Sequence, residues 1–364
     1  MASGARILVV NPGSTSTKVA VFEDARQRWI ATLDHPAEQL RNFRRVIDQC
    51  EFRQADVVRA VEAAGFSLRA LAAVVGRGGL LHPLVGGTYR VDERLLADLR
   101  AEVQGEHASN LGGLIAGQLA QRADCPAFIV DPVVVDELAP LARYSGLPPI
   151  RRRSIFHALN QRAAARKVAE RVGKRYEQGN FIVAHLGGGI SVGAHRRGRV
   201  IDVNNALDGD GPFAPERSGG LPAGDLARLC FSGQHTPADV QHMIRGGGGV
   251  VGYLGTNDMR AVEGRIGLGD RDALEVYEAM AYQVAKEIAA LAAVLCGEVD
   301  AVVLTGGLAR SEMFVGWIKQ RIGFLGPVHV FAGEMEMEAL ALGALRVLRG
   351  EERPRAYLGQ TEAT

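Results

Sequence analysis

Short apolar runs, bounded by small or polar residues, recur along the whole chain and predict buried β-strands. Most runs have four or five residues, which is too short for a buried helix but typical of a strand inside a sheet. The runs lie at residues 7–10 (ILVV), 19–22 (VAVF), 71–75 (LAAVV), 127–130 (AFIV), 181–184 (FIVA), 192–194 (VGA), 200–202 (VID), 301–304 (AVVL) and 328–331 (VHVF).

Longer segments with apolar residues at helical spacing lie between these runs and predict α-helices. They cover residues 111–122, 159–172, 271–295 and 335–348, and a further helix is expected to begin near Ser311. Strands that alternate with helices in both halves of a chain are typical of α/β domains. The pattern therefore predicts an α/β protein.

Two segments share the order strand, small-residue turn, strand. NPGSTSTK at residues 11–18 follows the first apolar run, and HLGGGIS at residues 185–191 follows the run at 181–184. Each predicts a β-hairpin in which glycine serves positions of positive φ. Asn11 and His185 are separated by about half the chain, which predicts a duplicated domain.

Both turns are candidate phosphate sites. Backbone N–H groups and hydroxyls of a small-residue turn can bind an anion, and Lys18 adds a positive charge at the exit of the first turn. One such turn alone is equally compatible with ordinary chain reversal, but its recurrence favours phosphate binding. A Walker A sequence is absent, which excludes a P-loop enzyme.

Other candidates for binding are arginines and glycines near predicted strand ends. Arg77 (in VVGRGG) and Arg217 (in ERSGG) stand among glycines that would let a ligand reach the guanidinium, which favours anion clamps over plain surface residues. Gly306 and Gly307 follow an apolar strand after Thr305. They are compatible with close approach of a flat ligand such as adenosine, or with a simple turn at a helix start.

Composition narrows the class of protein. The chain has 364 residues, 47% hydrophobic and 23% charged, which is typical of a globular protein of two domains. A net charge of +1 gives no global attraction to nucleic acid or to an anionic membrane. The basic clusters 151–153 and 195–197 are expected on a solvated face.

The cysteines and the N-terminal residues predict a cytoplasmic location. Four cysteines stand far apart without a CxxC pair, which argues against a zinc site or a disulfide framework and fits a reducing compartment. The N-terminal residues have no long apolar core of a secretory signal, and the apolar stretch 288–296 is too short to span a bilayer.

Taken together, these segments resemble the acetate and butyrate kinases, from the superfamily that also holds sugar kinases and actin-like ATPases. The resemblance runs from Ile7 to about Arg349, and the butyrate kinase branch is nearer in length and in motif form. Arg310 and the residues 332–335 (AGEM) depart from that branch at the nucleotide edge. The motifs are NPGSTSTK at 11–18, HASNLGG at 107–113, AHLGGGIS at 184–191, ERSG at 216–219 and LTGG at 304–307.

The resemblance implies two duplicated actin-like (ribonuclease H-like) α/β domains with an interdomain cleft. Residues 1–180 would carry the first phosphate loop and the acid, and residues 181–364 the second loop and the adenosine site. The last helix is one that can pack back on the N-terminal domain. The implied reaction is butyrate + ATP to butyryl phosphate + ADP, reversible and by direct transfer, with isobutyrate or acetate and propionate as alternative acids.

The resemblance also assigns roles to single residues. Arg77 would hold the acid's carboxylate, Arg217 would stabilise the transferring phosphoryl group, and His185 would hydrogen-bond that group. His157 matches an active-site histidine of the family. Magnesium, bound with ATP or ADP, would be held by Asn11, Asp131 and Glu336, with Glu338 as the alternative to Glu336. The nucleotide phosphates and adenosine would be bound by Asn11, Gly13, Ser14, Ser16, Lys18, Gly187, Gly188, Gly189, Gly306 and Gly307.

Two other classes stay open at this level, a sugar kinase of the same superfamily and a non-catalytic actin-like nucleotide-binding module. The expected partners are a short-chain acid and ATP, with neither nucleic acid nor membrane. A homodimer or larger homo-oligomer is also expected, because the family forms at least dimers. The apolar helix at 281–295 could supply an isologous surface or simply be core.

Overall fold

The computed structural model describes residues 4–359, and its contacts divide them into two compact units. Unit 1 comprises the residues up to Val135 together with those from Met335 onward, and unit 2 is Asp136–Glu334. Relative to the predicted division at residue 180/181, the segment 136–180 belongs with unit 2 and the last helix with unit 1.

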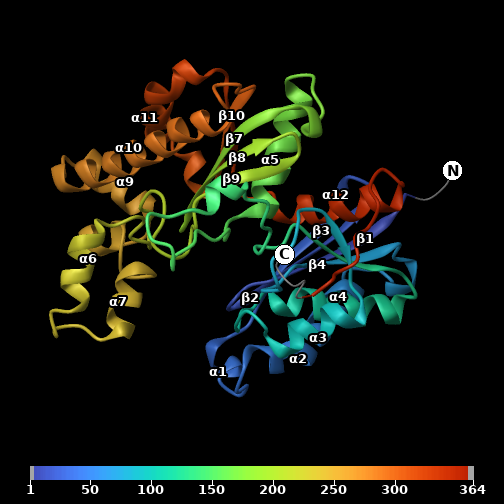
Figure 1. The fold of residues 1–364 in the computed structure, drawn as a ribbon. Coiled ribbons are helices and arrows are strands. Elements are labelled where there is room, and N and C mark those ends of the chain that lie inside the picture. The colour runs from blue at the N-terminus through green and yellow to red at the C-terminus, as the bar shows by residue number, and fades with distance from the viewer. Residues whose placement is uncertain (1–3, 360–364) are drawn as a thin grey trace. The chain divides into compact units, whose positions relative to one another are not determined.

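The sheet of unit 1 has the order β3-β2-β1-β4-β6-β5 (Figure 1). β1, β4 and β6 are parallel, whereas β1/β2, β2/β3 and β5/β6 are antiparallel. The strands are β1 (Arg6–Pro12), β2 (Ser16–Glu23), β3 (Arg26–Asp34), β4 (Ala73–Arg77), β5 (Thr88–Arg90) and β6 (Ala127–Val130).

Helices cover both faces of this sheet. Leu8 and Val10 alternate along β1 onto the face that packs against α4, in a core that also includes Val57 and Val61 of α2. α12 contacts β1, β4 and β6 from the other face (Figure 1). The helices are α1 (Ala37–Leu40), α2 (Cys50–Ala63), α3 (Glu93–Ala101), α4 (Asn110–Ala123) and α12 (Glu336–Leu348).

The sheet of unit 2 repeats this topology. Its order is β11-β10-β7-β8-β9, with β7, β10 and β11 parallel and β8 and β9 antiparallel to their neighbours. β7 to β11 therefore correspond to β1, β2, β3, β4 and β6 in order and direction, and β5 is an addition in unit 1. The strands are β7 (Asn180–Leu186), β8 (Ile190–Arg196), β9 (Arg199–Val203), β10 (Ala301–Gly306) and β11 (Val328–Ala332).

The helices of unit 2 are arranged around α10. Its apolar face, including Met280, Val284 and Ile288, is buried against β7, β8 and α11, so this helix is core and does not offer that face to a second copy. The helices are α5 (Ala158–Arg171), α6 (Ala223–Cys230), α7 (Pro237–Ile244), α8 (Val250–Leu254), α9 (Met259–Gly267), α10 (Arg271–Val294) and α11 (Glu312–Ile322).

The α/β class, both predicted hairpins and the predicted strands and helices are confirmed. The sequence pattern did not predict β3, β5, α1, α2, α3 or the helices between Ala223 and Gly267. Short 3₁₀ helices complete the described chain at Val46–Gln49, Leu68–Ala70, Pro140–Arg143, Tyr176–Gln178, Gly307–Arg310 and Gly323–Leu325. None of the described helices is long and apolar enough to cross a bilayer.

Candidate active site

In unit 1, three parallel strands end side by side, each at a predicted site residue. Asn11 lies near the end of β1, Arg77 ends β4, and Asp131 follows β6. The strand registers pair Val10 with Gly76 and Arg77 with Val130, so these ends lie in one row. The carboxyl ends of parallel strands are where open α/β sheets usually bind ligands.

A guanidinium, a carboxamide and a carboxylate meet at this edge. Arg77 Nη1 donates to Glu336 Oε2 at 3.0 Å, and Asn11 Nδ2 donates to the same oxygen at 2.7 Å. Glu336 is the first residue of α12, where the helix dipole favours a negative charge. Glu338, the alternative, is exposed on the same first turn. The structure therefore brings Asn11, Arg77 and Glu336 together.

Asp131 is held by the backbone opposite it. It is buried, has a φ of 39°, and its Oδ1 accepts from Gly87 N–H at 2.7 Å. Its N–H donates in turn to the Gly87 carbonyl at 3.0 Å. The carboxylate is thus fixed at the end of β6, one residue beyond the partner of Arg77.

A buried arginine supports the first predicted phosphate loop from beneath. Arg53 of α2 is fully buried, and its guanidinium donates to the carbonyls of Gly13 (2.7 Å), Ser14 (2.9 Å) and Ser16 (3.2 Å). Because these carbonyls are drawn toward α2, the loop is held in one conformation. Lys18 pairs with Asn11 across β1 and β2, which places it at the same end of the hairpin.

Sequence reasoning missed Arg53 entirely. No pattern distinguishes it from the solvent-exposed Arg59 on the same helix, which has 76% of its side chain exposed. His107 was also left out of the predicted site. Desolvation, together with the nearby positive charge of Arg77, lowers the pKa of His107, which therefore lies within electrostatic reach of the site. Its place in the HASNLGG motif was the available signal.

The glycines around Arg77 are required by packing against α4. A Cβ on Gly76 would lie 2.0 Å from the Gly112 carbonyl oxygen of α4, and one on Gly79 would lie 2.4 Å from Asn110 Oδ1. The backbone of α4 approaches β4 so closely that no side chain fits. Arg77 itself stays half-buried at the edge of the sheet.

In unit 2, the second hairpin turn gathers His185 and Arg217. A Cβ on Gly189 would lie 1.8 Å from Arg217 Nη1, and one on Gly187 would lie 3.2 Å from His185 Nε2. Arg217 also donates to the Ala206 carbonyl. Burial lowers its pKa, with Glu216 opposing that shift. The turn residues 187–189 thus lie between a buried histidine and a partly buried guanidinium.

Glycine in the two hairpin turns was predicted to serve positive φ, and this is wrong. None of Gly13, Gly187, Gly188 and Gly189 adopts a left-handed φ. Gly189 is required by space, because the Arg217 guanidinium lies where its Cβ would be.

The two predicted adenosine glycines differ in role. Gly306 ends β10 with a φ of 96°, and a Cβ there would lie 2.3 Å from the Leu186 carbonyl oxygen, so the fold itself requires glycine. Gly307 is exposed, with no atom within 4 Å of an added Cβ, and is the one open to a ligand. Arg310 lies over Gly333, whose Cβ would meet its Nη2 at 2.7 Å.

His157 is the residue just before α5, and its ring stacks on that of His185. The ring centroids are 3.9 Å apart with an interplanar angle of 20°. His157 Nδ1 lies 2.9 Å from Ser191 Oγ, the hydroxyl of the residue paired with His185 across the hairpin. The structure therefore brings His157, His185, Arg217 and the residues 187–189 into one region of unit 2.

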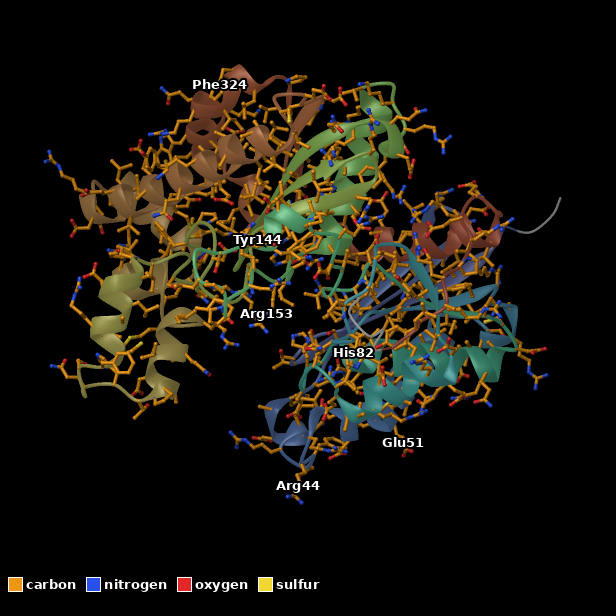
Figure 2. The ribbon with its side chains drawn as sticks, in the orientation of Figure 1. Arg44, Glu51, His82, Tyr144, Arg153 and Phe324 are labelled. Carbon is orange, nitrogen blue, oxygen red and sulfur yellow. The ribbon has the colours of Figure 1, made fainter. Side chains whose placement is uncertain are left out.

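The prediction of a solvated face for the two basic clusters is wrong for His195 and Arg152. His195 is fully buried in β8, and burial together with the Arg162 charge lowers its pKa to about 3. Arg152 is part-buried and donates to Asp202 Oδ1 at 2.8 Å. Arg196 is exposed as predicted, and so is Arg153, which is labelled in Figure 2.

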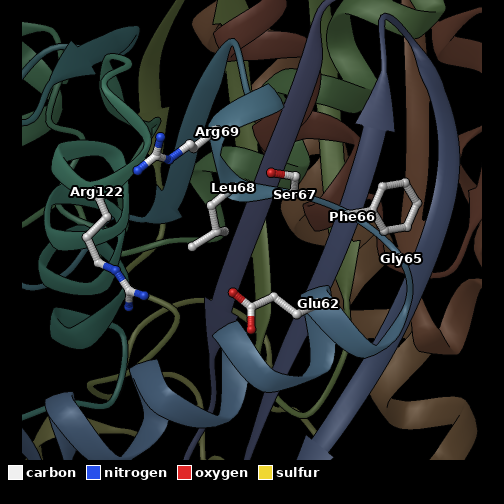
Figure 3. Close-up of a pocket in the computed structure, with 7 residues that line it drawn as sticks. All are labelled: Glu62, Gly65, Phe66, Ser67, Leu68, Arg69 and Arg122. Carbon is white, nitrogen blue, oxygen red and sulfur yellow. The ribbon is translucent and has the colours of Figure 1, made fainter.

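A pocket on unit 1 contains none of the predicted site residues (Figure 3). It lies between the end of α2, the short helix Leu68–Ala70 and the end of α4. Its lining mixes a carboxylate, two exposed guanidinium groups and apolar side chains, with no buried polar group facing it, and we assign it no part in the site. The lining residues are Glu62, Gly65, Phe66, Ser67, Leu68, Arg69 and Arg122.

Comparison of the sequence with known proteins gives a family and two similar relatives. Residues 146–328 match the Acetokinase family. Butyrate kinase 1 of Clostridium acetobutylicum is 53% identical over 352 residues, which cover 97% of this chain and 99% of that protein. Butyrate kinase 2 of the same organism is 51% identical with the same coverage.

A solved structure extends the comparison to the fold. The crystal structure of Porphyromonas gingivalis acetate kinase matches with a TM-score of 0.76 and 19% identity, covering 95% of this chain and 100% of that one. At that identity the match speaks for the shared fold.

Proposed function

This chain belongs to the acetokinase family, and from that membership we infer that it is an ATP-dependent kinase of short-chain fatty acid carboxylates. The observation that carries this conclusion is the identity of more than half of its residues, over nearly its whole length, with a protein named butyrate kinase. For the same reason we propose butyrate as its acid, with isobutyrate, propionate and acetate as the alternatives. Both proposals rest on relatives that match along the full chain.

Arg77 is assigned to the acid's carboxylate. A carboxylic acid is already ionised at neutral pH, so the nucleophile needs no general base. It needs a cation that holds it, and Arg77 already binds a carboxylate, that of Glu336, at 3.0 Å. The geometry thus supports an arginine that is oriented before substrate arrives.

Arg217, His185 and His157 are assigned to the transferring phosphoryl group. Phosphoryl transfer depends on positioning and on neutralising charge on the equatorial oxygens. Arg217 beside Gly189, and the two stacked histidines, supply a cation and hydrogen-bond donors next to the turn 187–189. The backbone of this turn and that of residues 13–16 are assigned to the nucleotide phosphates, and Gly307 to adenosine.

Magnesium is assigned to Asn11 and Glu336, with Asp131 at the neighbouring strand end. Among the residues that the structure describes, no cluster of three or more His, Cys, Asp and Glu side chains forms a ready metal cage. That suits magnesium, which usually takes one or two carboxylates and fills its shell with water and substrate phosphates. The oxygen donors of Asn11 and Glu336 fit it, and when bound it would neutralise charge on the phosphates.

A cytoplasmic location and a homo-oligomer complete the proposal. Both substrates, ATP and a free short-chain acid, are small anions, and none of the described helices could span a membrane. Because the apolar face of α10 is core, an oligomer would use other apolar side chains, such as Phe231 or Phe324, which are 90% and 77% exposed. A sedimentation experiment that finds only monomer at micromolar concentration would exclude the oligomer.

A coupled assay of ADP release tests the function against its alternatives. We expect turnover with butyrate, and weaker turnover with propionate or acetate, because one methylene in an apolar pocket is worth about 1–3 kcal/mol. Isobutyrate, the branched isomer of butyrate, is assayed beside them as the alternative acid. Glycerol serves as the sugar-like control and should give none. Activity with glycerol would favour a sugar kinase, and absence of turnover with every acid would favour a binding module.

A further inference from the structure

A buried chain of polar groups runs from the core of unit 2 to His157. Tyr176 Oη lies 2.9 Å from His195 Nδ1, and His195 Nε2 lies 3.0 Å from Gln161 Oε1. Gln161 Nε2 lies 2.8 Å from Ser191 Oγ, which lies 2.9 Å from His157 Nδ1. All four residues before His157 in this series are buried: Tyr176, His195, Gln161 and Ser191. Each of their polar hydrogens therefore needs an acceptor among the neighbouring polar groups.

The donor and the acceptor of each hydrogen bond can be assigned by starting from Gln161. Gln161 Oε1 can only accept, so His195 carries its proton on Nε2. A buried His195 is neutral, since burial holds its pKa far below neutrality, and its Nδ1 is therefore bare. Tyr176 must then donate its hydroxyl proton to that nitrogen.

The side-chain amide of Gln161 donates to Ser191. Its Nε2 also donates to the Ser191 carbonyl at 3.0 Å, and since a carbonyl can only accept, the amide cannot be flipped. Its second hydrogen then goes to Ser191 Oγ. Gly193 leaves room for this arrangement, because a Cβ there would lie 2.5 Å from Gln161 Oε1.

Ser191 has one hydroxyl proton, and among the hydrogen-bond partners of its Oγ only His157 Nδ1 can accept it. We propose that Gln161 and Ser191 are positioning residues that hold neutral His157 in its Nε2–H tautomer. His157 then acts toward its ligand as a hydrogen-bond donor through Nε2. The inference deepens the proposed function, because the ligand it serves is the phosphoryl group assigned to His157.

The tautomer matters because phosphoryl oxygens only accept hydrogen bonds. A His157 protonated on Nδ1 would turn the lone pair of Nε2 outward and repel the same oxygens. A donor fixed before the reaction costs no reorganisation when charge develops on the phosphoryl group. The stack on His185 fixes the plane of the ring, and the Ser191 bond fixes its proton.

The sharpest test uses an isosteric substitution that reverses the donor and acceptor roles along these hydrogen bonds. In Gln161→Glu, the ionised carboxylate can only accept, so the Ser191 carbonyl loses its donor. Ser191 Oγ would then donate to the carboxylate and would accept from His157 Nδ1–H instead. ¹⁵N spectra of histidine-labelled, unliganded protein distinguish the two tautomers, and His157→Gln identifies the signal. We expect Nε2–H in the wild type and Nδ1–H in Gln161→Glu, with kcat for the fatty acid lowered about 10²-fold and KM for ATP little changed.

A further variant keeps the test decisive if Gln161→Glu does not fold. Ser191→Ala removes the donor to His157 Nδ1 and should give mixed tautomers with kcat lowered roughly 5- to 10-fold. Tyr176→Phe removes the first donor of the chain. It is matched by Tyr277→Phe, which removes a buried hydroxyl bonded to Glu263 at 2.9 Å outside the chain. Neither tyrosine variant should change the His157 tautomer, because the Ser191 carbonyl already fixes the orientation of Gln161.

Because the spectra need no substrate, they separate this inference from the kinase proposal. Nε2–H in a wild-type protein that lacks kinase activity would overturn the proposed function and leave the tautomer assignment standing. A wild-type signal with the proton on Nδ1 would overturn the inference. So would a folded Gln161→Glu or Ser191→Ala variant with unchanged spectrum and unchanged kcat.

Discussion

Arg217 lies so close to Gly189 that its guanidinium takes the space of a side chain, which fixes its position beside the turn. A cation held there should matter most when charge spreads over the transferring phosphoryl group. Arg217→Ala should therefore lower kcat by about 10³-fold or more, with little change in KM for ATP. Steady-state kinetics over both substrates measure this. An equal rise in KM for ATP would assign Arg217 to ground-state nucleotide binding instead.

Arg77 should behave differently, because it would hold the acid in both the ground state and the transition state. Arg77→Ala is expected to raise KM for the fatty acid as well as to lower kcat. Lysine should restore activity only in part at either arginine, since a point charge lacks the planar two-pronged grip.

Arg196→Ala is the control for both arginines. Arg196 is exposed at the end of β8, so its replacement should change kcat and KM little. Folded Arg77→Ala and Arg217→Ala proteins that match this control in kcat and KM would contradict the proposed mechanism.

The element that shapes the first phosphate loop is α2, through Arg53. Arg53→Met would leave the carbonyls of Gly13, Ser14 and Ser16 without their buried donor. We expect the free energy of unfolding to fall by about 3 kcal/mol, and KM for ATP to rise because the loop loses its fixed conformation. Denaturant unfolding and kinetics measure the two effects.

The control on the same helix is Arg59→Ala. Arg59 is exposed and pairs with Asp56 at 3.2 Å, and such a pair is worth about 0–1 kcal/mol. Arg53→Lys should recover part of the stability, because an ammonium still donates to some of the carbonyls. If Arg53→Met proved as mild as Arg59→Ala, the loop would not depend on α2.

The sequence predicted the elements whose apolar residues have a strong period, and it missed those that carry few. β1, β4, β7 and β10 have almost continuous buried runs. β3, α6 and α7 have no buried residue at all. Where little apolar surface is buried, there is little periodicity to detect.

The sequence predicted the site residues that lie in motifs at strand ends. It missed those whose role depends on their being buried. Asn11, Arg77 and Glu336 are far apart in the chain, yet the structure joins them by hydrogen bonds. Arg53 and His195 lie in polar or basic stretches that look solvated. Whether such a side chain is buried depends on partners from distant segments, which neither period nor spacing reveals.

At the scale of the whole molecule, magnesium should be required for turnover. Asn11 and Glu336 come from opposite ends of the chain and meet within unit 1, so one metal would depend on the complete fold of that unit. Treatment with EDTA should abolish ADP release, and added Mg²⁺ should restore it. Full activity in EDTA would remove the metal role assigned to Asn11, Asp131 and Glu336.

The duplicated topology places a candidate phosphate turn at the same position in both units. The turn after β1 and the turn after β7 occupy equivalent places in the two sheets, each at the carboxyl edge of three parallel strands. One such edge holds Arg77 and the other lies next to Arg217. Loss of either arginine alone should therefore slow formation of the product.

The most direct test of the central claim is the chemical identity of that product. A carboxylate kinase joins phosphate to the acid as an acyl phosphate, which hydroxylamine cleaves, whereas a phosphate ester survives it. Incubation with ATP, Mg²⁺ and butyrate, followed by ³¹P NMR, should show a new acyl phosphate signal that disappears with hydroxylamine and is absent in Arg217→Ala. ADP formed without that signal, or a signal that resists hydroxylamine, would contradict phosphorylation of a carboxylate.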